Sequence, residues 1–199
     1  MSDPAGTMAL MNIMLFHSTY GLRPAVRRAA DRLRGAGHEV WTPDLFDGRT
    51  FETVEEGMAF QDEIGKDELL KTAVLAAAPY SERGLVYAGF SLGASIAQTL
   101  ALGDDKARGL LLLHGTSDIA PNASVDDLPV QLHVAEPDPF ETDDWLSAWY
   151  LQMGRAGADV EVYRYAGAGH IYTDPDLPDY DDQAAEATWR VALGFLETL

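Results

Sequence analysis

Ser91 is the residue whose sequence context most clearly permits chemistry. It stands in Gly89-Phe90-Ser91-Leu92-Gly93, a G-x-S-x-G pattern. An apolar run over residues 85–88 precedes the pattern, and apolar residues at helical spacing over 95–102 follow it, which predicts a strand, a sharp turn and a helix. Such a turn exposes its serine as a nucleophile elbow, and the small residues two positions away let the strand and helix pass closely. The alternative is a glycine-rich turn with an idle serine.

A serine hydroxyl is a poor nucleophile, so it needs a neighbouring base, and the base needs an acid that orients it. On a strand–elbow–helix scaffold the chain order is serine, acid, histidine. His170 fits this order, because it is the last histidine and lies in a glycine-rich turn after the final predicted strand. The other histidines fit less well, since two precede Ser91, one lies inside a predicted strand and one has no loop acid before it: His17, His38, His133 and His114.

Asp138 is the predicted orienting acid. It follows a predicted strand and lies between Pro137 and Pro139, which would fix its turn. Glu136, two residues earlier, is the main rival, and Asp118 after the preceding strand is a weaker one.

Acyl transfer also requires two backbone N–H donors that stabilise the developing oxyanion. The amide of Leu92, directly after the serine, is one expected donor. The second is expected in the loop after the first strand, from Thr19 or alternatively Ser18.

The elements that must position these residues alternate between strands and helices. This alternation predicts an α/β fold with a mostly parallel sheet, helices on both faces and chemistry at the carboxyl ends of the strands. Residues 46–65, where periodicity is weak, are expected to form a loop with a short helix that borders the site. The strands are predicted at 12–16, 39–42, 85–88, 109–115, 130–135 and 160–165, and the helices at 24–34, 66–78, 95–102, 143–154 and 183–199.

Length and composition favour a single domain over residues 12–199 behind a flexible leader at 1–11. The chain has 199 residues, no cysteine and a formal net charge of −18. That charge repels nucleic acids and anionic membranes, so neither is an expected partner. Without a signal peptide pattern or an apolar spanning run, a cytoplasmic monomer or homodimer is expected.

A metal site is the remaining chemical possibility that the sequence raises. His17 and His114 each end a predicted strand, but their spacing matches no standard zinc pattern. No metal and no cofactor are therefore predicted.

Several segments together resemble the dienelactone hydrolase family of α/β-hydrolases, from about residue 12 to the C-terminus. The resemblance implies a hydrolase core without a large cap, with Ser91, Asp138 and His170 as its triad. The segments that carry it are Phe16-His17-Ser18-Thr19-Tyr20-Gly21-Leu22, Thr42-Pro43-Asp44-Leu45-Phe46, Gly89 to Gly93, Glu136-Pro137-Asp138-Pro139-Phe140 and Tyr165-Ala166-Gly167-Ala168-Gly169-His170-Ile171-Tyr172.

The chain departs from the family pattern in two respects. The founding members carry a cysteine nucleophile and a glutamate in the first-strand loop, whereas this chain has Ser91 and Ser18 there. They also use arginine to hold a substrate carboxylate, whereas the loop after His170 carries Asp174 and Asp176. We therefore expect an uncharged or cationic small-molecule ester or lactone as substrate.

The expected function is that of a serine esterase, with two alternatives. The same triad could serve a thioesterase or an amidase, or the fold could be a catalytically silent small-molecule binding or partner module. Candidates for the substrate pocket are His17, Tyr20, Phe60, His114, Phe140 and Tyr172.

Overall fold

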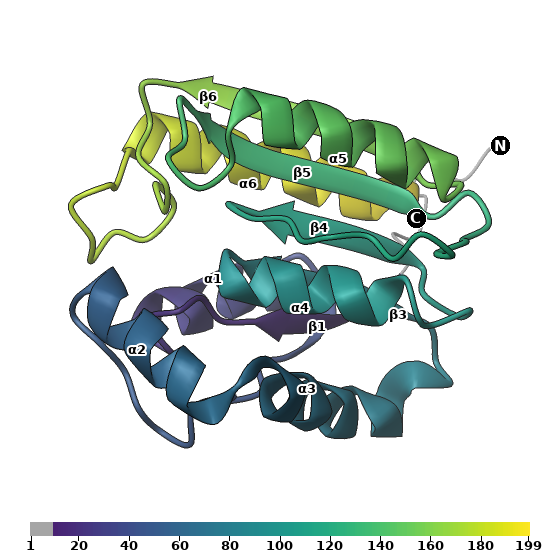
Figure 1. The fold of residues 1–199 in the computed structure, drawn as a ribbon, viewed down its shortest axis with the longest axis horizontal. Helices are drawn as coiled ribbons and strands as arrows, with labels where there is room; N and C mark the ends of the chain where they lie inside the picture. The colour runs from purple at the N-terminus through teal and green to yellow at the C-terminus, as the bar shows by residue number, and fades with distance from the viewer. Residues whose placement is uncertain (1–9) are drawn as a thin grey trace, which may run out of the picture.

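Six strands form one sheet in the order β2-β1-β3-β4-β5-β6, and every neighbouring pair is parallel. The structure, a computed structural model, describes residues 10–199. The arrowheads in Figure 1 point to one edge of the sheet, where the loops that follow the strands gather. The strands are β1 (Asn12–Phe16), β2 (Glu39–Trp41), β3 (Leu85–Phe90), β4 (Gly109–Leu113), β5 (Pro129–Glu136) and β6 (Asp159–Ala166).

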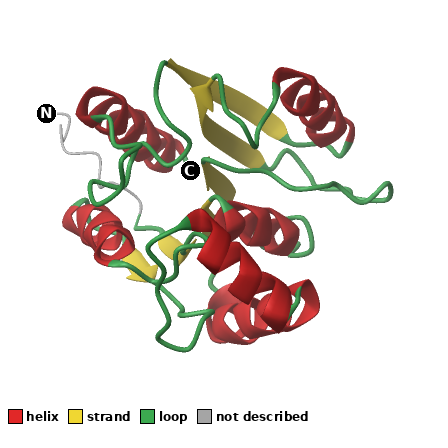
Figure 2. Ribbon diagram, turned by 60° about the vertical axis from the view of Figure 1, so that its left-hand side comes forward, coloured by secondary structure: helices red, strands yellow, loops and turns green. Residues whose placement is uncertain are grey.

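Helices cover both faces of the sheet, as Figure 2 shows. Helices α1 and α6 pack on one face, and α3, α4 and α5 pack on the other. The predicted α/β fold is therefore confirmed, and no large cap lies between the elements of residues 10–199. The helices are α1 (Pro24–Gly35), α2 (Val54–Ile64), α3 (Lys66–Ser81), α4 (Leu92–Ala101), α5 (Asp143–Arg155) and α6 (Asp182–Thr198).

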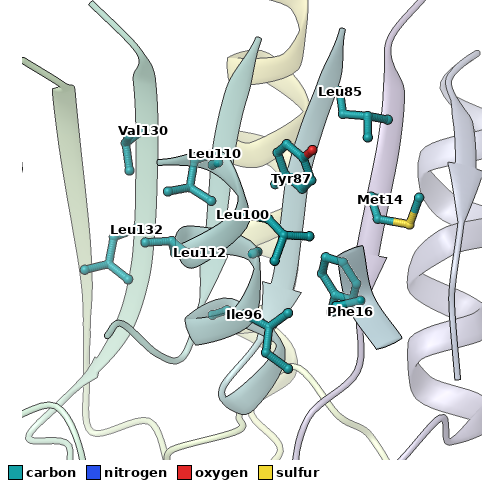
Figure 3. Packing of buried hydrophobic residues seen from close by; sticks show 14 of the residues in the cluster. Met14, Phe16, Leu85, Tyr87, Ile96, Leu100, Leu110, Leu112, Val130 and Leu132 are labelled. Carbon is teal, nitrogen blue, oxygen red and sulfur yellow. The ribbon is translucent and has the colours of Figure 1, made fainter. Parts of the chain in front are cut away.

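Alternate residues of each central strand serve the two faces. Leu110 and Leu112 of β4 belong to the core beneath α3–α5, whereas Leu111 and Leu113 belong to the core beneath α1 and α6. Figure 3 shows part of the first of these cores, in which Ile96 and Leu100 of α4 share one cluster with side chains of β1, β3, β4 and β5. A strand buried on both faces reads as a continuous apolar run, and each fully buried leucine contributes about 1.5–3 kcal/mol. The central strands are thus a rigid platform for the loops at their ends.

The chain order places a crevice between β1 and β3. The sheet grows in one direction from β1 to β2 and in the other from β3 to β6, so the loops after β1 and β3 diverge at this point. Ligands of open parallel sheets bind at such switch points, beyond the carboxyl ends of the strands. The loop after β1 carries Thr19, and β3 leads directly into Ser91.

Residues 46–65 form a loop followed by an 11-residue helix, α2, as the sequence predicted for this segment. One predicted boundary is wrong, because helix α3 continues past the predicted stop at Pro79 to Ser81. Pro79 removes the amide that would pair with the carbonyl of Leu75, a residue that is 66% exposed, so water can replace that hydrogen bond near the helix end.

The predicted leader extends too far. Met11 is buried, its amide donates to His38 Nδ1 at 3.3 Å and its carbonyl accepts from Glu39 N–H at 2.9 Å. Met11 therefore belongs to the domain, and leader residues 1–9 lie outside the described residues. In residues 10–199, no helix has the length and apolar character needed to cross a membrane.

Candidate active site

Ser91 lies on a strained turn between β3 and α4. Its φ of 51° and ψ of −109° are unusual for a residue with a side chain. Its amide donates to the Leu113 carbonyl at 2.8 Å, which ties the turn to β4. The serine is therefore held by its own backbone at the carboxyl end of the sheet.

Two glycines make this turn sterically possible. A Cβ at Gly89 would overlap the carbonyl of Gly93, and a Cβ at Gly93 would overlap the carbonyls of Phe16 and His17. Strand β3, helix α4 and the end of β1 consequently meet backbone to backbone. This is the close passage of strand and helix that a nucleophile elbow requires.

His170 links Ser91 to Asp138. Its Nε2 lies 3.0 Å from Ser91 Oγ, and its Nδ1 lies 2.8 Å and 3.0 Å from the two carboxylate oxygens of Asp138. Both His170 and Asp138 are buried. The structure thus brings together the three side chains that chain order singled out.

The state of Asp138 determines the tautomer of His170. Burial raises the pKa of Asp138. Three influences oppose this effect and leave the pKa below its ordinary value: the hydrogen bond from His170, the charge of His170, and hydrogen bonds from the backbone amides of Phe140 and Glu141. An ionised carboxylate only accepts hydrogen bonds. His170 Nδ1 must then carry a proton, which leaves Nε2 free to accept from the Ser91 hydroxyl.

The rival acids do not contact His170. Glu136 is exposed at the end of β5, and its carboxylate lies 3.7 Å from Arg164 Nη1. Asp118 borders the pocket but makes no hydrogen bond to either ring nitrogen of His170.

Two backbone amides beside Ser91 are available for an oxyanion. Thr19 and Leu92 both line the pocket that contains Ser91. Within residues 10–199, neither N–H donates to a backbone carbonyl, and an unpaired donor is normal for Leu92 at the start of a helix. Ser18, the alternative to Thr19, is not among the residues that line this pocket.

The Thr19 loop is packed directly against α2. A Cβ at Gly57 would overlap the Thr19 carbonyl, and Thr19 Oγ1 lies 3.4 Å from Gln61 Oε1. Helix α2 therefore fixes the position of one expected oxyanion donor.

The pocket beside Ser91 has a volume of about 510 Å³. Of the six predicted pocket residues, Tyr20 and Phe140 line it. The Phe140 ring also contacts the His170 ring, with centroids 4.5 Å apart. The other four predictions are wrong, because these side chains pack elsewhere: His17, Phe60, His114 and Tyr172.

His17 and His114, which were predicted to line the pocket, are instead fully buried structural groups. His17 Nδ1 lies 2.7 Å from the Ser18 carbonyl, and its Nε2 accepts from the Leu45 amide at 3.0 Å. His114 Nε2 lies 2.6 Å from Thr173 Oγ1, and its Nδ1 has no partner among the described residues. Burial lowers the pKa of both rings, and that of His114 lies well below its ordinary value.

Tyr172 and Phe60, which were also predicted to line the pocket, pack in or against the hydrophobic core instead. The Tyr172 hydroxyl lies 2.7 Å from Thr188 Oγ1 on α6, and its ring contacts His114. Phe60 packs with Phe46 and Phe51 at centroid distances of 5.3 Å.

Glu141 is a buried carboxylate that the sequence analysis missed. The amide and the hydroxyl of Thr116 donate to its two oxygens at 3.0 Å and 2.6 Å, and Trp145 Nε1 donates to Thr116 Oγ1 at 2.7 Å. Burial raises its pKa, although the Thr116 hydrogen bonds oppose the shift. The one sequence feature that could have indicated Glu141 as a site residue is its position three residues after Asp138. Glu141 joins the loop of the acid to the loop that passes beneath Ser91, where Gly115 lies.

In residues 10–199, no group of three or more histidine, aspartate or glutamate side chains is arranged to hold a metal ion. His17 and His114, the two histidines with which the sequence raised that question, make the separate contacts described above.

Known proteins share this fold. A crystal structure of a dienelactone hydrolase-like promiscuous phosphotriesterase, P91, from metagenomic libraries superposes with a TM-score of 0.81 at 20% identity, covering 95% of this chain and 86% of that one. A Pyrobaculum calidifontis esterase superposes with a TM-score of 0.66 at 16% identity, covering 98% of this chain and 78% of that one.

Sequence comparison gives the family. An Aquifex aeolicus (strain VF5) protein named "Putative carboxymethylenebutenolidase" is 22% identical over an alignment of 201 residues that covers 94% of this chain and 87% of that protein. The sequence model of the dienelactone hydrolase family matches residues 2–199. This hydrolase chain, with its α/β-hydrolase fold, therefore belongs to the dienelactone hydrolase family.

Proposed function

We propose that this hydrolase cleaves small carboxylic esters or lactones through an acyl-enzyme on Ser91. The observation that carries the proposal is the continuous relay from Ser91 Oγ to His170 Nε2 and from His170 Nδ1 to Asp138, at 3.0 Å and 2.8 Å. A binding module has no need of a base and an orienting acid in this geometry.

In the first half of the reaction, Ser91 Oγ attacks the substrate carbonyl carbon while His170 Nε2 takes the hydroxyl proton. The amides of Leu92 and Thr19 stabilise the oxyanion of the tetrahedral intermediate. As the intermediate collapses, the bond to the leaving oxygen breaks and His170 returns its proton to that oxygen. Asp138 stabilises the imidazolium and holds its ring in place.

In the second half, His170 takes a proton from an attacking water molecule, and the water oxygen bonds to the acyl carbon. The Ser91–acyl bond then breaks, and Ser91 Oγ recovers a proton from His170. The products are a carboxylic acid and an alcohol, or a hydroxy acid from a lactone.

A fluorophosphonate probe tests the nucleophile directly, because it reacts with activated serines. We expect one adduct on Ser91, located by mass spectrometry, and none in Ser91→Ala. Ser117→Ala is the matched control, since Ser117 also borders the pocket but makes no hydrogen bond to His170.

Turnover of a panel of aryl esters and lactones completes the test. We expect hydrolysis by wild type and Ser117→Ala, and a loss of at least about 10⁴-fold in Ser91→Ala. Failure of both labelling and turnover would instead favour a catalytically silent binding module. Labelling with turnover only of thioesters or amides would assign the same triad to a different acyl donor.

A further inference from the structure

The pocket beside Ser91 extends along one face of α4. Leu92, Ser95, Ile96 and Thr99 line it, and their spacing of three, four and seven residues places them in one row on the helix. At 1.5 Å per residue, this row is about 10 Å long. The pocket is therefore a trough that begins at Ser91 and runs toward the C-terminal end of α4.

The wall opposite α4 is mostly apolar. It is formed by α2 and α3, from which Val54, Met58, Leu69 and Leu70 line the trough. Pockets of this volume bury ligands of drug size. Such a trough offers more apolar wall than a single-ring lactone would cover.

Charge in the pocket is unfavourable for an anionic substrate. Three carboxylates line it, from Asp118, Glu141 and Asp179, against one ammonium group from Lys66. Asp179 lies beside the His170 turn, where its side chain is 2.7 Å from the position that a Cβ on Gly169 would occupy.

The proton transfer sets which part of the substrate enters the trough. His170 must reach the leaving oxygen to protonate it, so the alcohol portion lies on the side of His170, Phe140 and Asp179. The acyl portion lies on the other side of the scissile bond. Of the elements that line the pocket, α4 leads away from Ser91 along the row that ends at Thr99, so the acyl portion would lie along that row.

We propose that the trough along α4 is an acyl subsite that selects substrates with an elongated, uncharged acyl chain. This inference rests on the proposed function, because it takes Ser91 as the attacking atom. Catalytic efficiency should therefore depend on the length of the acyl chain, and blocking the far end of the trough should penalise long chains only.

Two variants narrow the trough from opposite walls. Thr99→Trp places a large ring near its far end, and Thr99 is exposed with its hydroxyl bonded only to the Ser95 carbonyl of its own helix, so the change should be accommodated. Leu70→Trp narrows the trough from α3. Val74→Trp is the control, because Val74 is 51% exposed on α3 and does not line the trough.

The readout is kcat/KM for p-nitrophenyl acetate, butyrate and octanoate. In wild type and Val74→Trp, we expect the octanoate to exceed the acetate by about 10-fold or more, because additional methylene groups are buried. In Thr99→Trp and Leu70→Trp, we expect the octanoate value to fall about 10-fold while the acetate value stays within about twofold.

The failure of this inference is distinct from that of the proposed function. If the acetate is hydrolysed and Ser91 is labelled, but neither chain length nor the two tryptophan variants change the ratio of octanoate to acetate, the acyl subsite is wrong and the function stands. An equal loss for both esters in both variants would also overturn the subsite. If no ester is hydrolysed and Ser91 stays unlabelled, the proposed function itself fails.

Discussion

At the elbow, residues 89–93 contact their neighbours backbone to backbone, since Gly93 lies against the carbonyls that end β1, and a Cβ at Gly115 would lie only 2.8 Å from Ser91 Cα. Around His170, by contrast, contacts are made by polar side chains from distant loops. Asp138 accepts from His170 and from two amides, and Glu141 binds Thr116. The elbow has no ionisable side chain, whereas the acid–histidine region depends on charge.

The support of the acid–histidine region extends to the loop after His170. The buried guanidinium of Arg23 donates to the carbonyls of Phe51 and Asp176 at 3.2 Å and 3.4 Å, and its Nε lies 3.7 Å from the Asp174 carboxylate. One side of the site is therefore positioned by excluded volume, and the other by hydrogen bonds. The elbow should therefore be sensitive to substitutions that add atoms. The acid–histidine region should be sensitive to substitutions that remove a charge or a hydrogen-bond acceptor.

The largest effect is expected from Asp138→Asn. The asparagine oxygen can still accept from the Phe140 and Glu141 amides, but its NH₂ group donates toward His170 Nδ1. The proton then moves to Nε2, which can no longer accept from Ser91. We expect kcat to fall about 10⁴-fold with the fold intact, measured by ester hydrolysis and thermal unfolding. Asp118→Asn, at the pocket edge, should stay within about twofold of wild type, and an Asp138→Asn enzyme with a tenth of the wild-type rate would refute the assigned tautomer.

Gly93→Ala tests the elbow with a single added methyl group. That group would overlap the carbonyls of Phe16 and His17, so the turn must shift. We expect a loss of about 1–3 kcal/mol in unfolding free energy and a loss of about 10²-fold in kcat/KM from the displaced serine. Gly154→Ala is the control, because a Cβ there meets nothing within 4 Å. Equal behaviour of the two variants would show that the elbow is not sterically fixed.

A smaller effect is expected from Glu141→Gln. The change removes a buried charge near His170 and one acceptor for the Thr116 hydroxyl. We expect kcat to fall about 3- to 10-fold, the equivalent of about 0.7–1.4 kcal/mol, while fluorophosphonate still labels Ser91. Glu136→Gln removes an exposed carboxylate from the end of β5, just before the same loop, and should leave kcat unchanged. A kcat unchanged by Glu141→Gln would restrict Glu141 to a packing role.

The smallest effect on turnover is expected from a pH response of stability that is strongest around His114. Burial, with the like charges of His170 and His133, keeps the pKa of His114 well below its ordinary value. Below about pH 6.5 the unfolded chain therefore binds a proton that the native ring does not, so stability falls as pH falls, by up to about 1.4 kcal/mol per pH unit. Corrected amide exchange should increase between pH 7 and pH 5, and the increase should be larger around Thr173 than over residues 89–97.

The variant His114→Asn provides the control for this response. The backbone at His114 has a φ of 64°, in the left-handed region, which asparagine adopts more readily than most other residues with a side chain. The pH dependence of exchange around Thr173 should become weaker in this variant. Faster exchange at the elbow than around Thr173 at pH 5 would contradict the contrast between the two regions.

Chain order was enough to predict the residues that meet at Ser91. Parallel strands bring their carboxyl ends to one edge, so loop residues that directly follow strands gather there, as His170 and Asp138 do. The orientation of side chains was not available in the same way. Tyr172 lies two residues after His170, yet its hydroxyl turns into the core to reach Thr188.

Helix α2 and Glu141 show two further limits of sequence patterns. The one buried residue of α2 is Gly57, and Phe60 and Ile64 are only partly buried, so the pattern indicated a short helix here without its bounds. Glu141 is held by Thr116, 25 residues away, through a side chain-to-backbone contact that follows no repeat. Both features depend on contacts between segments that only the folded chain brings together.

Because Gly57 contacts the Thr19 carbonyl, the position of α2 should affect both the range of substrates accepted and the rate of turnover. Helix α2 supplies Met58 to the wall of the trough and, one residue earlier, abuts the loop of an expected oxyanion donor. Engineering that pushes α2 outward to admit bulkier acyl groups would carry that amide away from the carbonyl oxygen. Changes that broaden specificity without a penalty in rate should therefore arise on α3 and α4, at positions such as Leu70 and Thr99.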